Sequence, residues 1–317
     1  MEDILFNQAM LGKLCRVSPN TVSRAINSDK FKDAELLTHE KKKFDVSTAR
    51  LITKELYANT RRPIRDSINV FYNFKGGTGK TSICYQVASH LSILGFNVLA
   101  LDLDPQGHLT SIMRVPEDWN GPTIYDVIIN GVDVRESIVP IHDGLDLLPA
   151  NISMTRIEVP LSGKTKREEK LSLVLDPLRK EYDFIMIDTN PTISILNMNA
   201  LVASDRVNIV CETQPFSLSG LNVLVDEMLS FFSDMGISRK YCIIPNKYEI
   251  KTATSQEVLG ALRARYGSLV INAVVRKAEE INIAAKRKLP VSAFCKSKSI
   301  GFEDVMDLVH EIVNQCL

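Results

Sequence analysis

The sequence has few of the features that mark membrane, secreted or disordered proteins. No apolar run approaches the 18 or more residues that a membrane-spanning helix requires. The segment Met1–Gln8 contains Glu2 and Asp3 and has no basic start before an apolar stretch, which argues against a secretory signal. With 15 Gly and 13 Pro in 317 residues, a collagen-like or low-complexity chain is also excluded. We therefore expect a cytoplasmic globular protein that does not associate with membranes.

Cysteine is sparse, and no two cysteines form a C-x-x-C pair. Such spacing is typical of reduced, buried thiols rather than of a disulfide framework or a zinc site. The six residues are Cys15, Cys84, Cys211, Cys242, Cys295 and Cys316.

The chain has no net charge, but its charges are unevenly distributed. Residues 1–68 hold 13 Lys and Arg against 9 Asp and Glu, and residues 239–298 hold 13 against 4. Two basic regions in a neutral protein predict two surfaces that face polyanions. The alternative is that these charges coat solvated helix faces.

The organisation of the chain predicts two domains, residues 1–66 and 67–317. Pro63 lies in the charged stretch Arg61–Arg65, where it interrupts the helical periodicity of the first part. After it, short apolar runs without polar alternation are separated by amphipathic segments, a pattern that predicts a mostly parallel sheet flanked by helices. The order of the strands is left open. The expected strands are Ile68–Phe74, Asn97–Leu103, Leu145–Leu148, Phe184–Ile187, Val207–Cys211 and Cys242–Ile244, and the expected helices are Thr81–Leu94, Lys170–Arg179, Leu218–Phe232, Ser255–Arg265 and Ile300–Cys316.

A glycine-rich segment lies between the first of these strands and the first helix. Glycines let backbone N–H groups converge on an anion at a helix N-terminus. Lys80 is expected to neutralise the β- and γ-phosphates of a nucleotide, and Thr81 to coordinate Mg²⁺. The usual first glycine of such a loop is replaced by Phe74, and a second lysine, Lys75, follows it. The expected nucleotide-binding residues of the loop are Lys75, Gly76, Gly77, Thr78, Gly79, Lys80, Thr81 and Ser82.

Three motifs occur in order and resemble those of the ParA/MinD family of ATPases. Lys75–Thr81 resembles the family's deviant phosphate loop (deviant Walker A), and Leu101–Gly107 is similar to its D-x-D-P-Q-G motif. Asp183–Pro191 is similar to its Walker B strand with a D-T-x-P ending. His108 and Asn190 stand where many members have Asn and Pro, respectively. This resemblance implies a P-loop ATPase that uses ATP and Mg²⁺.

The resemblance also implies roles for single residues. Asp104 is expected to orient the attacking water, Asp188 to hold Mg²⁺ together with Thr81, and Asn246 to contact adenine. Lys75 is expected to reach the nucleotide of a second subunit, which implies a homodimer with ATP between its subunits. The catalytic residues predicted in this way are Lys75, Lys80 and Asp104. Asp102 is either a further catalytic carboxylate or the cap of a turn.

The segment Gln8–Asn27 resembles the helix–turn–helix of DNA-binding repressors. Ser18 is a good N-cap with Pro19 at the first helical position, and the apolar positions are suitably spaced. The second helix presents short polar side chains and one arginine, as recognition of base edges requires. A small helical cap with a polar surface is the alternative. The expected contacts to DNA are Asn20, Thr21, Ser23 and Arg24.

Two further features complete the expected N-terminal domain. His39–Phe44 is interpreted either as a wing that touches phosphates, giving a winged helix–turn–helix, or as a solvated loop. Ser47 is expected to cap a helix that continues to Tyr57.

A DNA-reading head on such an ATPase resembles the larger plasmid partition ATPases, which regulate their own operon. The resemblance implies segregation of a plasmid or chromosome on the nucleoid, together with a ParB-like centromere-binding partner. The second basic region is expected to bind nonspecific DNA in the ATP state through Arg276, Lys286 and Arg287.

Other relatives that share the loop fit less well. The cysteines match no cluster-bridging pattern of a nitrogenase-type iron protein. The acidic segment Ile300–Leu317 lacks the basic residues that a membrane-binding tail needs. The remaining alternative is a nucleotide-switched transcriptional repressor without a transport role.

Overall fold

The core of the protein is a twisted sheet of seven strands. The computed structural model describes residues 4–28, 31, 43–60 and 66–317. Within these residues the strand order is β5-β6-β4-β7-β3-β8-β9, and every neighbouring pair is parallel except β5 and β6. The prediction of a mostly parallel sheet is therefore confirmed. The strands are β3 (Ser67–Tyr72), β4 (Val98–Asp102), β5 (Val139–His142), β6 (Leu145–Leu148), β7 (Phe184–Asp188), β8 (Arg206–Glu212) and β9 (Lys240–Asn246).

The predicted strands all form, with ends that match or are shifted by one or two residues, but β5 was missed. Its residues are half-buried or exposed, so it lacks the apolar run of the central strands. It also contains Pro140, which a sheet accepts at an edge, where no partner needs the missing N–H. β5 pairs antiparallel with β6 at that edge.

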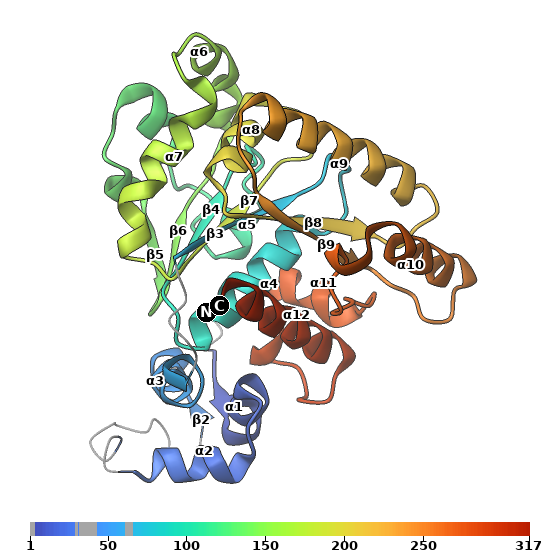
Figure 1. Ribbon diagram of the computed structural model, residues 1–317. Coiled ribbons are helices and arrows are strands. Elements are labelled where there is room, and N and C mark those ends of the chain that lie inside the picture. Colours follow the sequence, from blue (N-terminus) through green and yellow to red (C-terminus); the bar gives the residue numbers. More distant parts are fainter. Residues whose placement is uncertain (1–3, 29–30, 32–42, 61–65) are drawn as a thin grey trace.

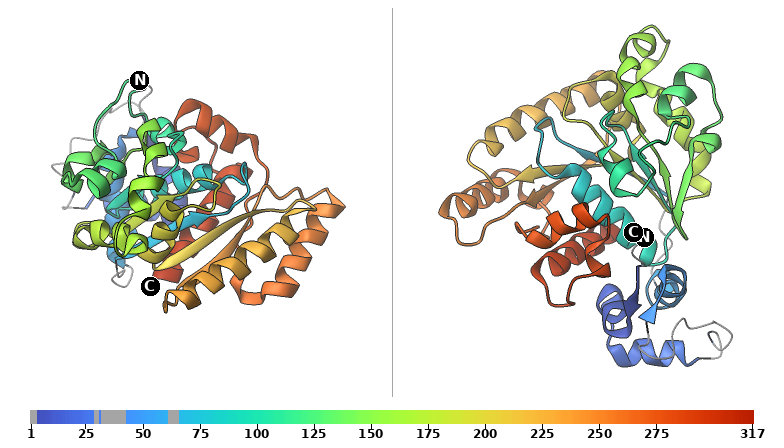
Figure 2. Two further views of the ribbon diagram at one scale, coloured as in Figure 1. Left: turned by 90° about the horizontal axis from the view of Figure 1, so that it is seen from above. Right: turned by 180° about the vertical axis from the view of Figure 1, so that it is seen from behind.

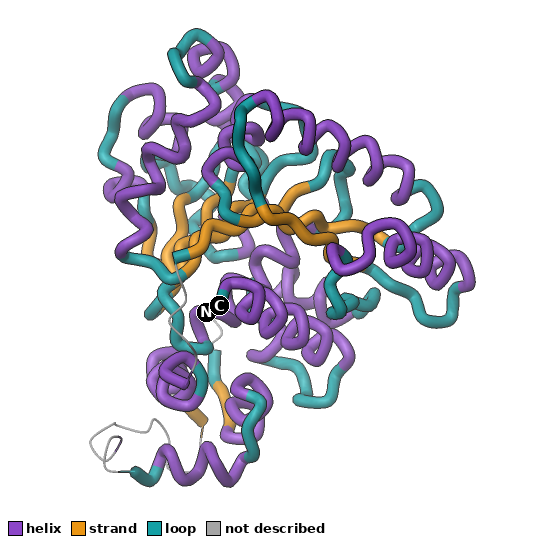
Figure 3. Tube along the Cα trace, viewed as in Figure 1, coloured by secondary structure: helices purple, strands orange, loops and turns teal. Residues whose placement is uncertain are grey.

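Helices cover both faces of the sheet, as Figure 1 and the tube in Figure 3 show. One buried cluster joins α4 and α12 to the sheet, and a second joins α7, α8 and α9 to its other face. The expected helix Lys170–Arg179 ends as α-helix at Leu175 and continues as a 3₁₀ turn, because Pro177 cannot donate a helical hydrogen bond. The helices of this part are α4 (Lys80–Ile93), α5 (His108–Ile112), α6 (Glu158–Ser162), α7 (Lys170–Leu175), α8 (Ile195–Ala203), α9 (Ser217–Asp234), α10 (Ala253–Tyr266), α11 (Glu279–Arg287) and α12 (Ile300–Cys316).

The N-terminal unit consists of two short strands and a set of small helices. β1 (Phe6–Asn7) pairs antiparallel with β2 (Lys43–Phe44). Helix α1 (Gln8–Cys15) is followed by α2 (Pro19–Ile26). The predicted cap of α2 is correct, since the Ser18 hydroxyl accepts a hydrogen bond from the Thr21 N–H at 3.1 Å.

The third helix of this unit, α3 (Val46–Leu56), begins earlier than the sequence suggested. Asp45 caps it by accepting a hydrogen bond from the Thr48 N–H at 2.8 Å, so the predicted cap at Ser47 is wrong. Asp45 lies two residues before Ser47, and its side chain satisfies one of the first N–H groups of the helix, which have no partner within the helix. Residues 39–42 of the expected wing and the expected linker Arg61–Arg65 lie outside the described residues.

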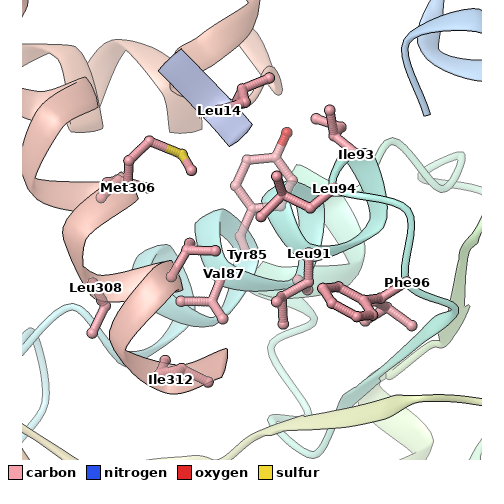
Figure 4. Packing of buried hydrophobic residues seen from close by; sticks show 14 of the residues in the cluster. Leu14, Tyr85, Val87, Leu91, Ile93, Leu94, Phe96, Met306, Leu308 and Ile312 are labelled. Carbon is pink, nitrogen blue, oxygen red and sulfur yellow. The ribbon is translucent and has the colours of Figure 1, made fainter. Parts of the chain in front are cut away.

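The N-terminal unit and the sheet unit share one hydrophobic core. Leu14 of α1 lies beside Met306 of α12 and Tyr85 of α4 in Figure 4, and all three belong to one buried cluster. The two units are therefore packed against each other, and Figure 2 shows the N-terminal unit against the C-terminal end of α4.

A buried arginine fixes this packing. Arg50 of α3 is 5% exposed and donates hydrogen bonds to the carbonyl oxygens of Ser92 and Phe96. A cation at the end of α4 complements the partial negative charge of its last carbonyl groups. Arg50 also packs closely against Gly144. A Cβ at position 144 would lie 2.1 Å from Cζ of Arg50, so this position requires glycine.

No helix in the described part of the chain is long and apolar enough to cross a membrane.

Because the two units share a core, a cavity in α3 should destabilise the protein. We expect Ile52→Ala, at a fully buried site, to lower the free energy of unfolding by about 2–5 kcal/mol. The neighbouring Leu51 is 54% exposed, so Leu51→Ala should change it by less than about 0.5 kcal/mol. Urea unfolding of both variants measures the difference, and equal effects would contradict the burial of Ile52 in the core.

Candidate functional site

The loop between β3 and α4 has the geometry of an anion-binding loop. Gly77 and Gly79 have φ values of 77° and 92°, in the left-handed region that favours glycine. A Cβ on Gly79 would lie 2.4 Å from Nδ2 of Asn246, so only glycine fits there. No side chain caps the N-terminus of α4, which leaves its first N–H groups available to a ligand.

The lysines and hydroxyls of the loop lie at the N-terminus of α4 and just before it. Lys80 is the first residue of α4 and 6% exposed, and its ammonium donates to the carbonyl oxygen of Lys75 at 3.3 Å. Burial lowers the pKa of Lys80, while the charges of Asp188 and Asp104 raise it. Thr81 and Ser82 follow in the first turn of α4 and are half-buried. A buried cation at a helix N-terminus favours a polyanionic ligand.

Asp188 is a buried carboxylate whose protein contacts do not satisfy it. It ends β7 and is fully buried, and neither of its oxygens accepts a hydrogen bond of normal geometry within the described residues. Burial raises its pKa well above the ordinary value and the charge of Asp102 raises it further, while Thr81 and Lys80 lower it. A carboxylate in this position is suited to ligate a divalent cation, directly or through water.

Asp102, the register partner of Asp188 on β4, has a different role. Its carboxylate accepts hydrogen bonds from the Thr110 N–H at 2.9 Å, the Thr110 hydroxyl at 2.8 Å and the Asp104 N–H at 3.0 Å. Burial raises the pKa of Asp102 to about 6, against these hydrogen bonds, which lower it. Of the two interpretations of Asp102, this geometry favours the cap of a turn. Asp104 remains half-buried, and its carboxylate accepts from the Gln106 N–H at 2.9 Å.

Asn246, at the end of β9, borders a cleft beside the loop. Its side-chain amide donates to the carbonyl oxygen of Thr78 at 2.7 Å, which fixes its orientation. The cleft is lined by α4, by the residues after β9 and by α11, including Ser82, Lys277 and Asn282. Asn246 therefore lines this cleft, and its contact with adenine stays a prediction.

A carboxylate that sequence reasoning missed joins two lysines at this site. The Lys75 ammonium donates to Oε2 of Glu212 at 2.8 Å, and the Lys247 ammonium donates to Oε1 at 2.7 Å. Lys247 also donates to the carbonyl oxygen of Gly77 in the loop. Burial raises the pKa of Glu212, but hydrogen bonds from Lys247 and Lys75 outweigh burial and leave it below its ordinary value. Glu212 carries no motif signal, because only the pairing of β8 with β3 brings it to the loop, and the pairing with β9 places Lys247 beside it.

The residues predicted to contact DNA lie on two separate surfaces. Asn20, Thr21 and Arg24 are exposed on α2 and Ser23 is half-buried, opposite the buried Val22 and Ile26. The other set lies near α11.

In that second set, Lys286 and Arg287 are exposed in the last turn of α11. Arg276 differs, because its guanidinium forms an ion pair with both carboxylate oxygens of Asp304 on α12. The structure therefore separates Arg276 from the two exposed residues.

Comparison with known proteins places this arrangement in a family. A family model described as an AAA domain matches residues 66–236. An uncharacterized protein of Pseudomonas putida is 32% identical over 77% of this chain and 93% of its own. The chromosome-partitioning ATPase Soj of Treponema pallidum is 29% identical, over 77% of this chain and 96% of its own.

Solved structures show the same fold. A cobyrinic acid a,c-diamide synthase of Mycobacterium smegmatis, with a bound ATP analogue and magnesium, is 26% identical with a TM-score of 0.63, over 70% of this chain and 91% of its own. A plasmid partition protein of Borrelia burgdorferi bound to AMPPNP is 22% identical with a TM-score of 0.67, over 79% of this chain and 99% of its own.

The raised pKa of Asp188 has a consequence for stability. At a pH below the ordinary pKa of an aspartate, Asp188 is neutral in both the native and the unfolded state. As the pH rises, Asp188 ionises first in the unfolded state, so the native state loses stability. We expect Asp188→Asn to raise the melting temperature at pH 7, and the gain to shrink as pH falls toward 4. Thermal unfolding between pH 4 and 8, without nucleotide, measures it.

The same substitution at Asp102 provides the contrast. Asp102→Asn should lower the melting temperature. Both oxygens of Asp102 accept hydrogen bonds, and replacing one of them with an NH₂ group would place a donor against an N–H or O–H donor. A loss of stability in Asp188→Asn similar to that in Asp102→Asn would contradict the assignment of Asp188 as an unsatisfied carboxylate.

Proposed function

Because the chain belongs to the ParA/Soj-type partition ATPases of the AAA domain family, we propose that it hydrolyses ATP to drive DNA segregation. The observation that carries this proposal is the loop with two lysines beside the unsatisfied Asp188. A loop that binds phosphates and a carboxylate that can hold a cation are the two parts that phosphoryl transfer to water requires.

The residues present fit ATP with Mg²⁺. The N-terminus of α4 and Lys80 hold the phosphates, while Thr81 and Asp188 hold Mg²⁺, which neutralises charge on the phosphate oxygens. Asp104 orients the attacking water, and Asn246 contacts adenine. In support, the synthase of M. smegmatis has been solved with an ATP analogue and magnesium on the same fold.

Hydrolysis takes place in a homodimer with ATP between the subunits. Lys75 lies at the start of the loop with a half-exposed ammonium, so it can extend toward the nucleotide of the second subunit. A cation supplied at the transferring phosphate stabilises the charge of the transition state. Basal hydrolysis is then slow, because it waits for the dimer, and DNA and the partner stimulate it.

The dimer acts on the nucleoid together with a ParB-like, centromere-binding partner. Lys286 and Arg287 at the exposed end of α11 bind nonspecific DNA in the ATP state. Arg276 is the weakest member of this set, because Asp304 neutralises its guanidinium.

The N-terminal unit binds an operator and regulates the operon of the protein. Helix α2 exposes the side chains that major-groove recognition uses, and its buried face is fixed by α1 and α3. The alternative function, a nucleotide-switched repressor without transport, uses the same residues and differs in needing no stimulated hydrolysis.

The ATPase rate distinguishes the two functions. With nonspecific DNA and the centromere-binding partner, we expect a low basal rate to rise, and Lys75→Ala to lower the stimulated rate by a factor on the order of 10³. Lys180→Ala, at an exposed lysine outside both basic regions, is the control and should leave the rate unchanged. A rate that neither addition raises would favour the repressor.

The two DNA surfaces should respond to different variants. Arg24→Ala should weaken binding to one operator by about 1–3 kcal/mol and leave binding to random DNA unchanged. The charge reversal in the double variant Lys286→Glu/Arg287→Glu should weaken binding to random DNA in the presence of ATP and leave binding to the operator unchanged. In a salt titration, the negative slope of log K against log[salt] should become shallower by about 0.9 for each phosphate contact that the double variant loses. An equal loss on both DNAs for either variant would overturn its assignment.

A further inference from the structure

Lys75 is held within its own subunit by Glu212. The carboxylate of Glu212 lies at the end of β8, and its side chain is 12% exposed, whereas that of Lys75 is 50% exposed. One oxygen binds Lys75 and the other binds Lys247, so a single carboxylate holds both lysines. The proposed function requires Lys75 to extend outward, toward a second subunit, and this contact opposes that movement.

The position of Glu212 is fixed by the sheet. Glu212 pairs in register with Asn246 at the ends of β8 and β9, and Lys247 follows with φ of 54°. A residue other than glycine rarely adopts this left-handed conformation, and the ion pair and the bond to Gly77 hold it there. The carboxylate is therefore presented to Lys75 by a backbone that is held in place.

The charges make this contact a competitor of nucleotide. A carboxylate beside an anion-binding loop repels phosphates and occupies two of the cations that would attract them. A polyphosphate that enters the loop offers the same lysines a stronger, multiply charged partner. Both lysines are half-exposed, so the contact is modest in strength and can be broken by a ligand.

We propose that Glu212 is an internal latch that holds Lys75 in its own subunit until nucleotide displaces it, so that dimerisation waits for ATP. Glu212 is a positioning residue that acts through Lys75. This inference rests on the proposed function, because it presumes that ATP binds the loop and that Lys75 acts across the dimer.

The test is Glu212→Gln, which keeps the shape of the side chain and removes its charge. Affinity for ATP is measured by calorimetry, and the dimer fraction by sedimentation over a range of ATP concentrations. We expect ATP to bind about threefold to tenfold more tightly, because two half-exposed ion pairs are released together, and the dimer to form at correspondingly lower ATP. Unchanged or weaker ATP binding by Glu212→Gln would overturn the latch.

Two further variants separate the latch from a general change of charge. Glu249→Gln removes a carboxylate that pairs with Lys277, a residue of the cleft beside the loop, and should change neither quantity by more than about twofold. In a Lys75→Ala background, Glu212→Gln should no longer promote the dimer. An equal gain in Glu249→Gln, or a gain that persists without Lys75, would contradict the proposal.

Glu212→Asp provides a second route if the glutamine variant fails to fold. It keeps the charge but shortens the side chain by one methylene, so it cannot reach both lysines, and a smaller gain of the same sign is expected. If the wild-type protein bound no ATP, the proposed function itself would fail. If it bound ATP and dimerised while both Glu212 variants matched it, the latch alone would fail.

Discussion

The site depends on the parallel pairing of the central strands. β3 lies between β7 and β8, with β4 beside β7 and β9 beside β8, so the carboxyl ends of five strands meet at one edge. The loop follows β3, the buried carboxylates end β4 and β7, and Glu212 and Asn246 end β8 and β9. A crevice at the carboxyl ends of parallel strands is where such sheets bind ligands. A change in strand order would separate these groups.

At this edge of the sheet, lysines and carboxylates lie close together and largely neutralise one another. Lys80 lies near Asp188 and Asp104, and Lys75 and Lys247 share Glu212. Asp188 is the exception, because it is buried without hydrogen bonds of normal geometry among the described residues. A site that keeps an unsatisfied carboxylate loses stability relative to a neutral side chain, a cost that functional sites commonly carry.

The N-terminal unit is bound to the same framework. Arg50 contacts the carbonyl groups at the C-terminal end of α4, the helix whose N-terminal end forms the loop, and Leu14 shares the core with α12. In the proposed dimer, both copies of α2 would then be carried by the ATPase units rather than by free tethers. Operator binding and dimerisation would in this way constrain each other geometrically.

Much of this protein could be predicted from its sequence, because the relevant signals are local. The apolar runs predicted every strand buried on both faces, and the Lys75–Thr81 loop placed its glycines and lysines between a strand and a helix. Ser18 and Pro19 predicted the start of α2. Edge strand β5 and the cap at Asp45 were missed, since a half-exposed strand has no apolar run and several nearby side chains can cap the same helix. The tertiary structure alone decided the strand order, the ion pair of Arg276 with Asp304, the docking of Arg50 on α4 and the contact of Glu212 with Lys75. Apart from the pairing of β5 with β6, each of these joins residues 28 or more positions apart, and no local pattern records which distant side chain will supply the compensating charge.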